Sequence, residues 1–201
     1  MPAARRDGLR RREALLDAAL RCFVDAGILG TGIEQIRRAA GASPSSVYHH
    51  FDGRAGVILA LLIRTFERLF AHLAGRVVAH EGAEASVRAL VDGHLEWVLE
   101  HRDEARFLYQ AMSLEVLPAA EVAALVDAKA RLLAPIVAHF TRFIAEGALP
   151  PWSPTMLDVV LLGPSHEACR RFLGGAELDP AWMRGVLPGL AWRSLAGEPA
   201  R

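Results

Sequence analysis

Residues 33–51 read IEQIRRAAGASPSSVYHHF, and this stretch decides the fold. Its apolar residues recur at three- and four-residue spacing up to Ala40, which predicts a short helix. Gly41 then breaks the helix, and Ser43 followed by Pro44 is typical of a helix N-terminus. A second short helix is predicted to follow and to end at the close of the stretch. Two short helices joined by a tight glycine-containing turn are the sequence form of a helix-turn-helix.

Helical periodicity also dominates the sequence on both sides of this stretch, and no convincing alternating strand pattern is present. A first helix is predicted from about Leu9 to Ala26, with Gly27 as its C-cap. Thr31-x-x-Glu34 has the form of a capping box, which predicts Thr31 as the N-cap of the next helix. Six longer helices are predicted further on, over about residues 54–79, 84–101, 103–116, 119–146, 154–173 and 180–196. We therefore expect an all-α fold of about nine helices without a sheet.

The charge is distributed unevenly along the chain. Residues 1–55 contain nine arginines against six acidic residues, whereas residues 56–201 contain 14 basic and 17 acidic residues. A basic front end favours contact with a polyanion, although an ordinary solvated arginine tail would have the same composition. We expect two domains: a three-helix domain over 1–55, with the helix-turn-helix at about 33–51, and a larger helical domain over 56–201.

Several other functions are not supported by the sequence. Cys22 and Cys169 lie far apart in apolar helical patterns, which favours buried free thiols over a disulfide. No signal peptide follows the charged N-terminus, and the longest strictly apolar stretch, Val57–Ile63, is too short to span a bilayer, so a cytoplasmic protein is expected. Residues 80–201 match no catalytic motif, and His166–Cys169 has no second ligand pair at zinc spacing. We expect no enzyme activity, no cofactor and no metal.

A larger set of residues around the turn forms a specific pattern. These residues are Arg12 to Ala19, Phe23, Gly27, Thr31, Ile33, Ile36, Ala39 to Ser43 and Val47 to Phe51. Over about residues 10–60, without a gap, the chain closely resembles the DNA-binding domain of the tetracycline-repressor (TetR) family. The Ala-Ala-Gly-x-Ser turn followed by Tyr-x-His-Phe is highly specific. The resemblance implies a dimeric, ligand-responsive repressor that reads duplex DNA.

The expected DNA contacts follow from position in the motif and from this resemblance. Hydroxyls at helix N-termini can meet phosphate, and residues at the start of the recognition helix can reach base edges. Tyr48 and His49 face outward if Val47 and Phe51 face the core, and in family-like complexes such a pair grips the phosphate backbone. Arg54 occupies the place where the family usually shows a lysine that meets a phosphate. The full predicted set is Thr31, Ser43, Pro44, Ser45, Ser46, Tyr48, His49 and Arg54.

The recognition helix also departs from the family pattern. Pro44 and Ser45 stand where Lys and Gly are common, so one basic contact is missing. Arg5, Arg6 and the run Arg10–Arg12 are expected to replace part of that charge by reaching into the minor groove or along phosphates.

The resemblance implies that the larger domain binds a small effector and forms the dimer. Side chains of the candidate pocket residues are more often simple core; these residues are Trp97, Phe107, Tyr109, Met112, Phe140 and Phe143. The last two predicted helices are apolar over more than one face, which suits a four-helix dimer interface. The candidates there are Leu161, Leu162, His166, Phe172, Trp182, Val186 and Leu190.

A twofold dimer would place two recognition helices about one DNA turn, 34–36 Å, or a multiple of it apart, so the operator should be roughly palindromic. An effector would release DNA by favouring a dimer with wrongly spaced helices, with the helix that starts near Arg54 as the lever. Three alternatives remain open at this stage. They are an activator or ligand-independent regulator of the same fold, a small-molecule-binding or enzymatic helical bundle, and a non-specific architectural DNA binder.

Overall fold

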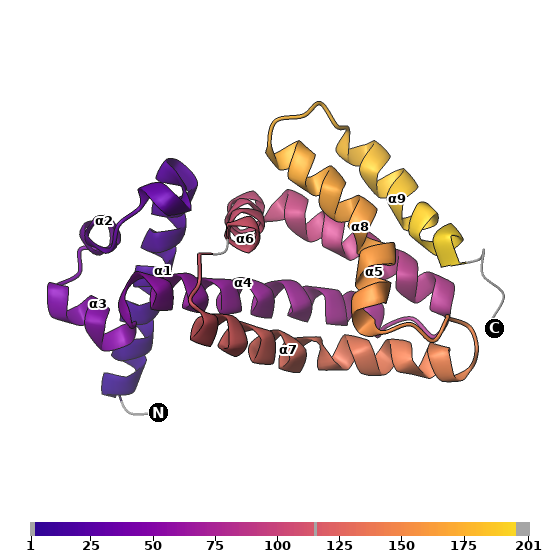
Figure 1. Cartoon of the computed structure of the whole chain (residues 1–201), viewed down its shortest axis with the longest axis horizontal. Helices are drawn as coiled ribbons and strands as arrows, with labels where there is room; N and C mark the ends of the chain where they lie inside the picture. Colours follow the sequence, from indigo (N-terminus) through magenta and orange to yellow (C-terminus); the bar gives the residue numbers. More distant parts are fainter. Residues whose placement is uncertain (1–2, 115, 196–201) are drawn as a thin grey trace. The chain divides into compact units, whose positions relative to one another are not determined.

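The computed structural model describes residues 3–114 and 116–195, which form nine α-helices and no strand (Figure 1). The predicted all-α fold is therefore confirmed. The helices are α1 (Ala3–Gly30), α2 (Ile33–Ala39), α3 (Pro44–His50), α4 (Gly53–Val77), α5 (Ala83–Glu100), α6 (Arg102–Ser113), α7 (Ala119–Ala145), α8 (Pro154–Leu173) and α9 (Pro180–Leu195).

Helix α1 is longer than predicted at both ends. It begins at Ala3 rather than near Leu9, and it continues to Gly30. Gly27 has φ 75° and ψ 159°, so the regular helix is interrupted at the residue that was predicted as its C-cap. Because the helix begins so early, the arginines of the predicted N-terminal tail belong to a helix.

The prediction that Thr31 caps α2 is wrong. The N-cap of α2 is Gly32, and no side chain makes a capping hydrogen bond there. The Thr31 side chain is directed back to the end of α1, where its hydroxyl donates to the carbonyl oxygens of Cys22 (3.0 Å) and Gly27 (2.8 Å). Thr31 is 1% exposed, and its side chain ties the link before α2 to the last turns of α1.

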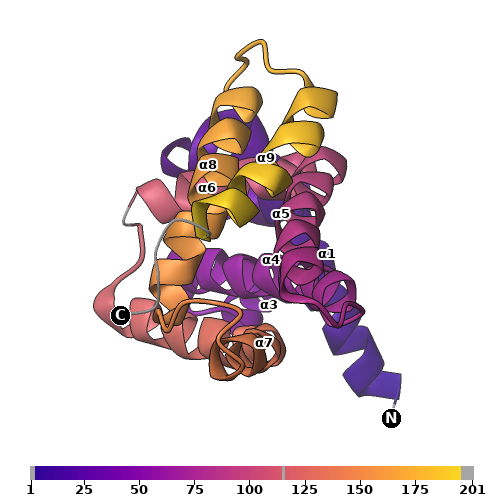
Figure 2. The same ribbon diagram turned by 90° about the vertical axis from the view of Figure 1, so that its right-hand side faces the viewer.

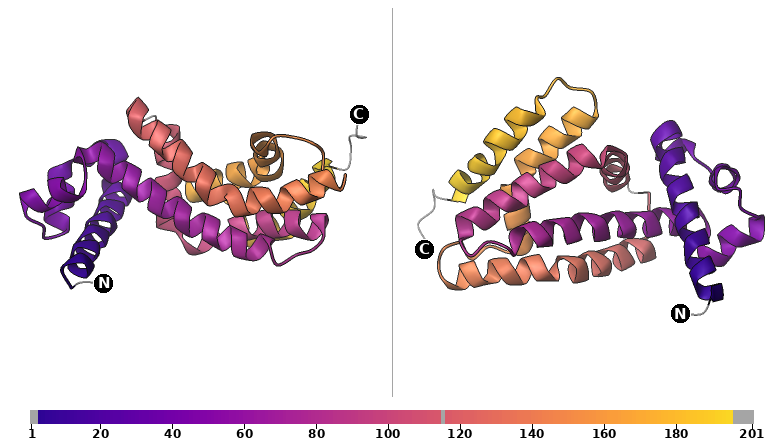
Figure 3. Two further views of the ribbon diagram at one scale, coloured as in Figure 1. Left: turned by 90° about the horizontal axis from the view of Figure 1, so that it is seen from below. Right: turned by 180° about the vertical axis from the view of Figure 1, so that it is seen from behind.

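Contacts divide the chain into two compact units. The first unit consists of residues up to Phe66 and residues 103–129, and it contains α1, α2 and α3. Within it α2 packs on α1, and Figure 3 shows this pair from two sides. Its buried apolar side chains include Leu15, Leu16, Phe23, Ile36, Val47, Phe51, Ile58 and Leu61. Burial of such a side chain contributes roughly 1.5–3 kcal/mol, so this core holds the short helices in place.

The second unit consists of residues 67–102 and those after 129. Here α5 packs against α8 and α9, and α8 packs against α9 (Figure 2). The predicted domain boundary between residues 55 and 56 stays a prediction. Among the helices that the structure describes, none combines the length and apolarity needed to cross a bilayer.

A cluster of charged side chains joins helices of the second unit. Asp92 of α5 accepts two hydrogen bonds from Arg184 of α9, at 2.7 Å each, and one from Arg76 of α4 at 3.0 Å. Glu96, one turn further along α5, pairs with Arg184 at 3.2 Å and with Arg76 at 3.1 Å. The hydrogen bond from Arg184 is the main cause that lowers the pKa of Asp92. These contacts fix the angle of α9 on α5.

Candidate nucleic-acid interface

The predicted helix-turn-helix is present as α2 and α3, with residues 40–43 as the turn. Gly41 has φ +60°, a left-handed conformation that strains residues with a side chain. The N–H of Gly41 donates to the carbonyl of Arg38, and that of Ala42 donates to the carbonyl of Arg37, both at 3.0 Å. The Arg37 guanidinium also donates to the carbonyl of Ala42 at 2.9 Å. Backbone hydrogen bonds and the Arg37 side chain therefore both stabilise the turn.

Helix α3 has one buried face and one exposed face. Val47 and Phe51 are 1% and 6% exposed, and they anchor the helix in the core of the first unit. Tyr48 is 62% exposed and His49 is also exposed. The predicted outward orientation of Tyr48 and His49 is confirmed, and both side chains are available to a partner.

Three serines lie at the N-terminal end of α3. Ser43 is the N-cap with ψ 154°, as predicted, but its side chain makes no capping hydrogen bond. Its Oγ lies 3.2 Å from Oγ of Ser45 instead. Ser43 and Ser45 are exposed and Ser46 is half-buried, whereas the side chain of Pro44 lies outside the described part of the chain. The two exposed hydroxyls therefore contact each other at the N-terminal end of α3.

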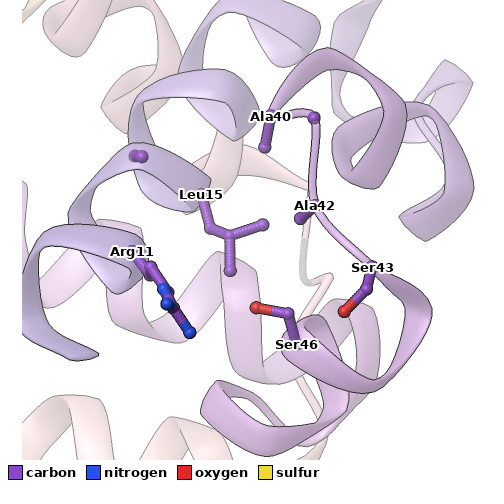
Figure 4. A pocket seen from close by; sticks show the side chains of 8 residues that line it. Arg11, Leu15, Ala40, Ala42, Ser43 and Ser46 are labelled. Carbon is purple, nitrogen blue, oxygen red and sulfur yellow. The ribbon is translucent and has the colours of Figure 1, made fainter. Parts of the chain in front are cut away.

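A hollow of about 260 Å³ lies between α1 and the turn. Its lining residues are Arg11, Ala14, Leu15, Ala40, Gly41, Ala42, Ser43 and Ser46. Figure 4 shows the Arg11 guanidinium and the hydroxyls of Ser43 and Ser46 around this hollow. In the sequence Arg11 is one of several N-terminal arginines, and only its position one helical turn before the buried Leu15 could have distinguished it.

Two predicted phosphate contacts are engaged within the chain. Thr31 is buried at the end of α1, as described above. Arg54, the second residue of α4, donates from Nε to the carbonyl of Thr31 at 2.8 Å and from Nη2 to the carbonyl of Ile28. Phosphate contact by either residue stays a prediction.

The C-terminal end of α3 lies among positive charges. The pKa of His50 is lowered, first by partial burial and then by the charges of His49, Arg12 and Arg11. The Arg12 guanidinium lies 5.4 Å from the centre of the Phe51 ring, which places a cation against the anchor of the helix. Arginines that would attract a polyanion therefore lie beside this end of the helix.

The candidate pocket residues are divided between the two units. Phe107, Tyr109 and Met112 belong to the first unit, and Trp97, Phe140 and Phe143 belong to the second. Phe107 stacks on Phe23, and Trp97 stacks on His101 with ring centroids 5.1 Å apart. Met112 is 49% exposed. An effector pocket lined by these six residues stays a prediction.

The candidate dimer residues divide into buried and exposed groups. Leu161 and Leu162 of α8 are 2% and 7% exposed, so they are already packed within the chain. On α9 the large apolar side chains Trp182, Val186 and Leu190 are exposed by 47%, 37% and 40%. Their i, i+4, i+8 spacing places them on one face of the helix. His166 and Phe172 are half-buried. The assignment of an interface stays a prediction.

Two short helices, a glycine turn and an exposed face on the second helix define the class of helix-turn-helix DNA-binding proteins. The family model "Bacterial regulatory proteins, tetR family" matches residues 15–61, which run from α1 into α4. Over these residues the chain resembles the tetR family.

Curated relatives match part of the chain. The HTH-type transcriptional regulator BetI of Rhizobium meliloti is 40% identical over 81 residues, which are 40% of this chain and 38% of BetI. The HTH-type transcriptional repressor KstR2 of Rhodococcus jostii is 31% identical over 100 residues, or 50% of this chain and 48% of KstR2. The chain therefore spans less than half of the length of these relatives.

Solved structures show the same fold over nearly the whole chain. A TetR family transcription regulator from Marinobacter aquaeolei superposes with a TM-score of 0.74 at 18% identity, covering 96% of this chain and 98% of that one. FadR from Bacillus subtilis, solved in complex with stearoyl-CoA, superposes with a TM-score of 0.71 at 12% identity, covering 93% and 99%. At these identities the likeness concerns the fold alone.

Proposed function

We propose that this chain is a sequence-specific transcriptional regulator, a homodimeric repressor that a small-molecule effector releases from a roughly palindromic operator. The observation that carries the proposal is the two-faced arrangement of α3. Val47 and Phe51 hold the helix in the core, while Tyr48 and His49 face outward. A helix held in this way can enter a major groove about 12 Å wide.

On this proposal the exposed residues have different tasks. Ser45 and Ser46, at the start of α3, meet base edges, and a hydroxyl can donate to or accept from several bases. Tyr48 and His49 contact phosphates and fix the helix in the groove. The protein would act in the cytoplasm, where bacterial DNA is found.

Dimer formation and effector control belong to the second unit in this proposal. The exposed apolar face of α9 provides a surface for a second copy of the chain. The complex of FadR with stearoyl-CoA supports the idea that this fold can hold a small effector. Trp97, Phe140 and Phe143 are the buried aromatic residues of the second unit that we propose for its binding.

The experiment that tests the proposal is selection of duplexes from a random pool, followed by sequencing. We expect enrichment of a motif with two inverted half-sites whose centres lie about one helical turn apart, or a multiple of it. Equal recovery of all sequences would instead indicate an architectural DNA binder. A transcription assay on the selected sequence, with and without candidate effectors, separates repression from activation.

A variant pair connects that result to α3. Tyr48→Ala should weaken binding to the selected duplex about tenfold or more, because it removes a contact to DNA. The thermal midpoint should hardly change, since the side chain is 62% exposed. Val126→Ala, 59% exposed on α7 in the same unit, is the matched control and should leave affinity unchanged. Equal affinities of all three proteins would contradict the role of α3.

A further inference from the structure

Arg54 connects two parts of the DNA-binding unit that are distant in sequence. Its Nε donates to the carbonyl of Thr31 at 2.8 Å, and its Nη2 donates to the carbonyl of Ile28. Ile28 lies near the C-terminal end of α1 and Thr31 lies in the link between α1 and α2, whereas Arg54 is the second residue of α4. A planar guanidinium with several N–H donors suits two neighbouring acceptors in a way that a lysine ammonium does not.

The buried residue Thr31 makes further hydrogen bonds in the same segment. The Thr31 hydroxyl donates to the carbonyls of Cys22 and Gly27, and the Thr31 N–H donates to the carbonyl of Ile28 at 3.4 Å. Hydrogen bonds to backbone carbonyls of α1, together with the Arg54 side chain of α4, therefore hold the link from α1 to α2 in place. The start of α2, and with it the turn that leads to α3, depends on this arrangement.

The other end of the motif meets Arg54 as well. Helix α3 ends at its C-cap, Phe51, and α4 begins at Gly53, whose N–H donates to the carbonyl of Phe51 at 3.0 Å. Gly53 has φ +63°, which allows so short a connection. Arg54 is thus joined through the chain to the end of α3, and through hydrogen bonds to the end of α1 and the link that precedes α2. Arg54 is therefore connected to the segments on both sides of the helix-turn-helix.

We propose that Arg54 is a positioning residue, which holds the helix-turn-helix at a fixed angle on α4, and that it does not act as a phosphate contact. The inference rests on the proposed function and specifies how α4 controls the DNA-reading helix. It replaces the role expected from the family resemblance, in which a cation at this position meets a phosphate. In the structure the guanidinium is directed to two carbonyls of its own chain.

Arg54→Lys distinguishes the two roles, because lysine keeps the charge and loses the planar fork. We expect Arg54→Lys and Arg54→Ala to lower the ratio of affinities for the selected and a scrambled duplex by about tenfold or more. The slope of log affinity against log salt should stay at the wild-type value, since no phosphate contact is lost. Fluorescence anisotropy at several salt concentrations gives both quantities, and circular dichroism checks the fold of each variant.

Arg38 provides the control, because it is exposed on α2 and carries the same charge. Arg38→Lys should leave the affinity ratio unchanged. The proposal is overturned if Arg54→Lys behaves as the wild type while Arg54→Ala reduces the salt slope by about 1.8, which corresponds to one lost phosphate contact in each protomer of the dimer. It is also overturned if the variants only lower the thermal midpoint and keep the full affinity ratio, because that result describes a purely stabilising side chain.

The wild-type measurement separates this inference from the proposed function. A wild-type chain with no preference for any selected duplex would remove the proposed function, and the role of Arg54 in DNA reading would fall with it. A clear wild-type preference that Arg54→Lys retains would remove only the role of Arg54. If Arg54→Ala does not fold, Arg54→Lys alone carries the comparison.

Discussion

Phe23 of α1 stacks on Phe107 of α6, with ring centroids 5.5 Å apart and ring planes at 12°. Both side chains are 1% exposed, and both belong to the first unit. The core that supports the helix-turn-helix is therefore completed by a residue more than fifty positions after the motif. A shift of α6 would displace Phe107 and disturb its packing on Phe23, because well-packed interiors transmit small displacements.

The first prediction concerns the stability of this core. Phe107→Ala should lower the free energy of unfolding by about 3–5 kcal/mol, through lost burial and the cavity that remains. Met112→Ala on the same helix, at a side chain that is 49% exposed, should change it by less than about 0.5 kcal/mol. Denaturant unfolding of the three proteins provides the measurement. Similar midpoints for all of them would argue against a stacked pair at the centre of the unit.

The hollow between α1 and the turn leads to a second prediction. Its lining includes the exposed Arg11 beside the hydroxyls of Ser43 and Ser46, a combination of donors suited to a phosphate oxygen. Arg11→Ala should reduce the salt slope of DNA binding by about 1.8, because each protomer of the proposed dimer loses one phosphate contact, in contrast to Arg54→Ala. Arg21→Ala, at an exposed arginine of α1 that does not line the hollow, is the control. An unchanged slope for Arg11→Ala would show that no phosphate is bound there.

The third prediction follows from a buried histidine pair. His94 of α5 is 2% exposed and meets His166 of α8 edge to face, with ring centroids 4.6 Å apart. Burial, and then the charge of His166, lowers the pKa of His94 from 6.5 to about 3. The unfolded chain therefore binds more protons than the folded chain between these two values. The stability due to neutral His94 is complete above pH 6.5 and decreases as the pH falls toward 3.

Unfolding experiments at pH 7 and pH 5 can test this sign. The wild type should lose about 2 kcal/mol more than His94→Gln between the two values, because the variant has no group to titrate at that position. The comparison with the variant cancels the titration of other histidines. Parallel losses in the two proteins would mean that His94 does not remain neutral in the folded chain.

The fourth prediction concerns the exposed face of α9. Trp182→Glu and Leu190→Glu should each convert the proposed dimer to a monomer, because they place a charge among the apolar side chains of that face. Ala138→Glu, exposed on α7 in the same unit, should leave the dimer intact. Sedimentation equilibrium measures the mass directly. Dimers of unchanged stability in both α9 variants would assign the interface to another surface.

Local sequence signals predicted the helices and the turn correctly. The three- and four-residue spacing of apolar side chains locates the helices, since the helical period alone sets it. Gly41 marks the turn because it has a positive φ there, and the positions of Val47 and Phe51 already imply that Tyr48 points outward. Each of these features depends on a few neighbouring residues.

The contacts that sequence reasoning missed join residues that are far apart along the chain. Arg54 binds a carbonyl 23 positions earlier, and Phe107 completes a core begun at Phe23. Thr31 fits a capping box by spacing, but the carbonyls at the interrupted end of α1 offer its hydroxyl two acceptors. The spacing of apolar residues in the sequence cannot predict such contacts, because they form only once the helices have packed.

Methylation interference on the selected duplex tests the central claim, that α3 reads the major groove, most directly. Methylation of guanine at N7 places a methyl group in the major groove, where α3 would lie. The account predicts that binding is blocked by N7 methylation in two clusters whose centres are about 10 base pairs, or a multiple of that, apart. Binding that tolerates every N7 methyl group, or that is blocked only by modifications in the minor groove, would contradict it.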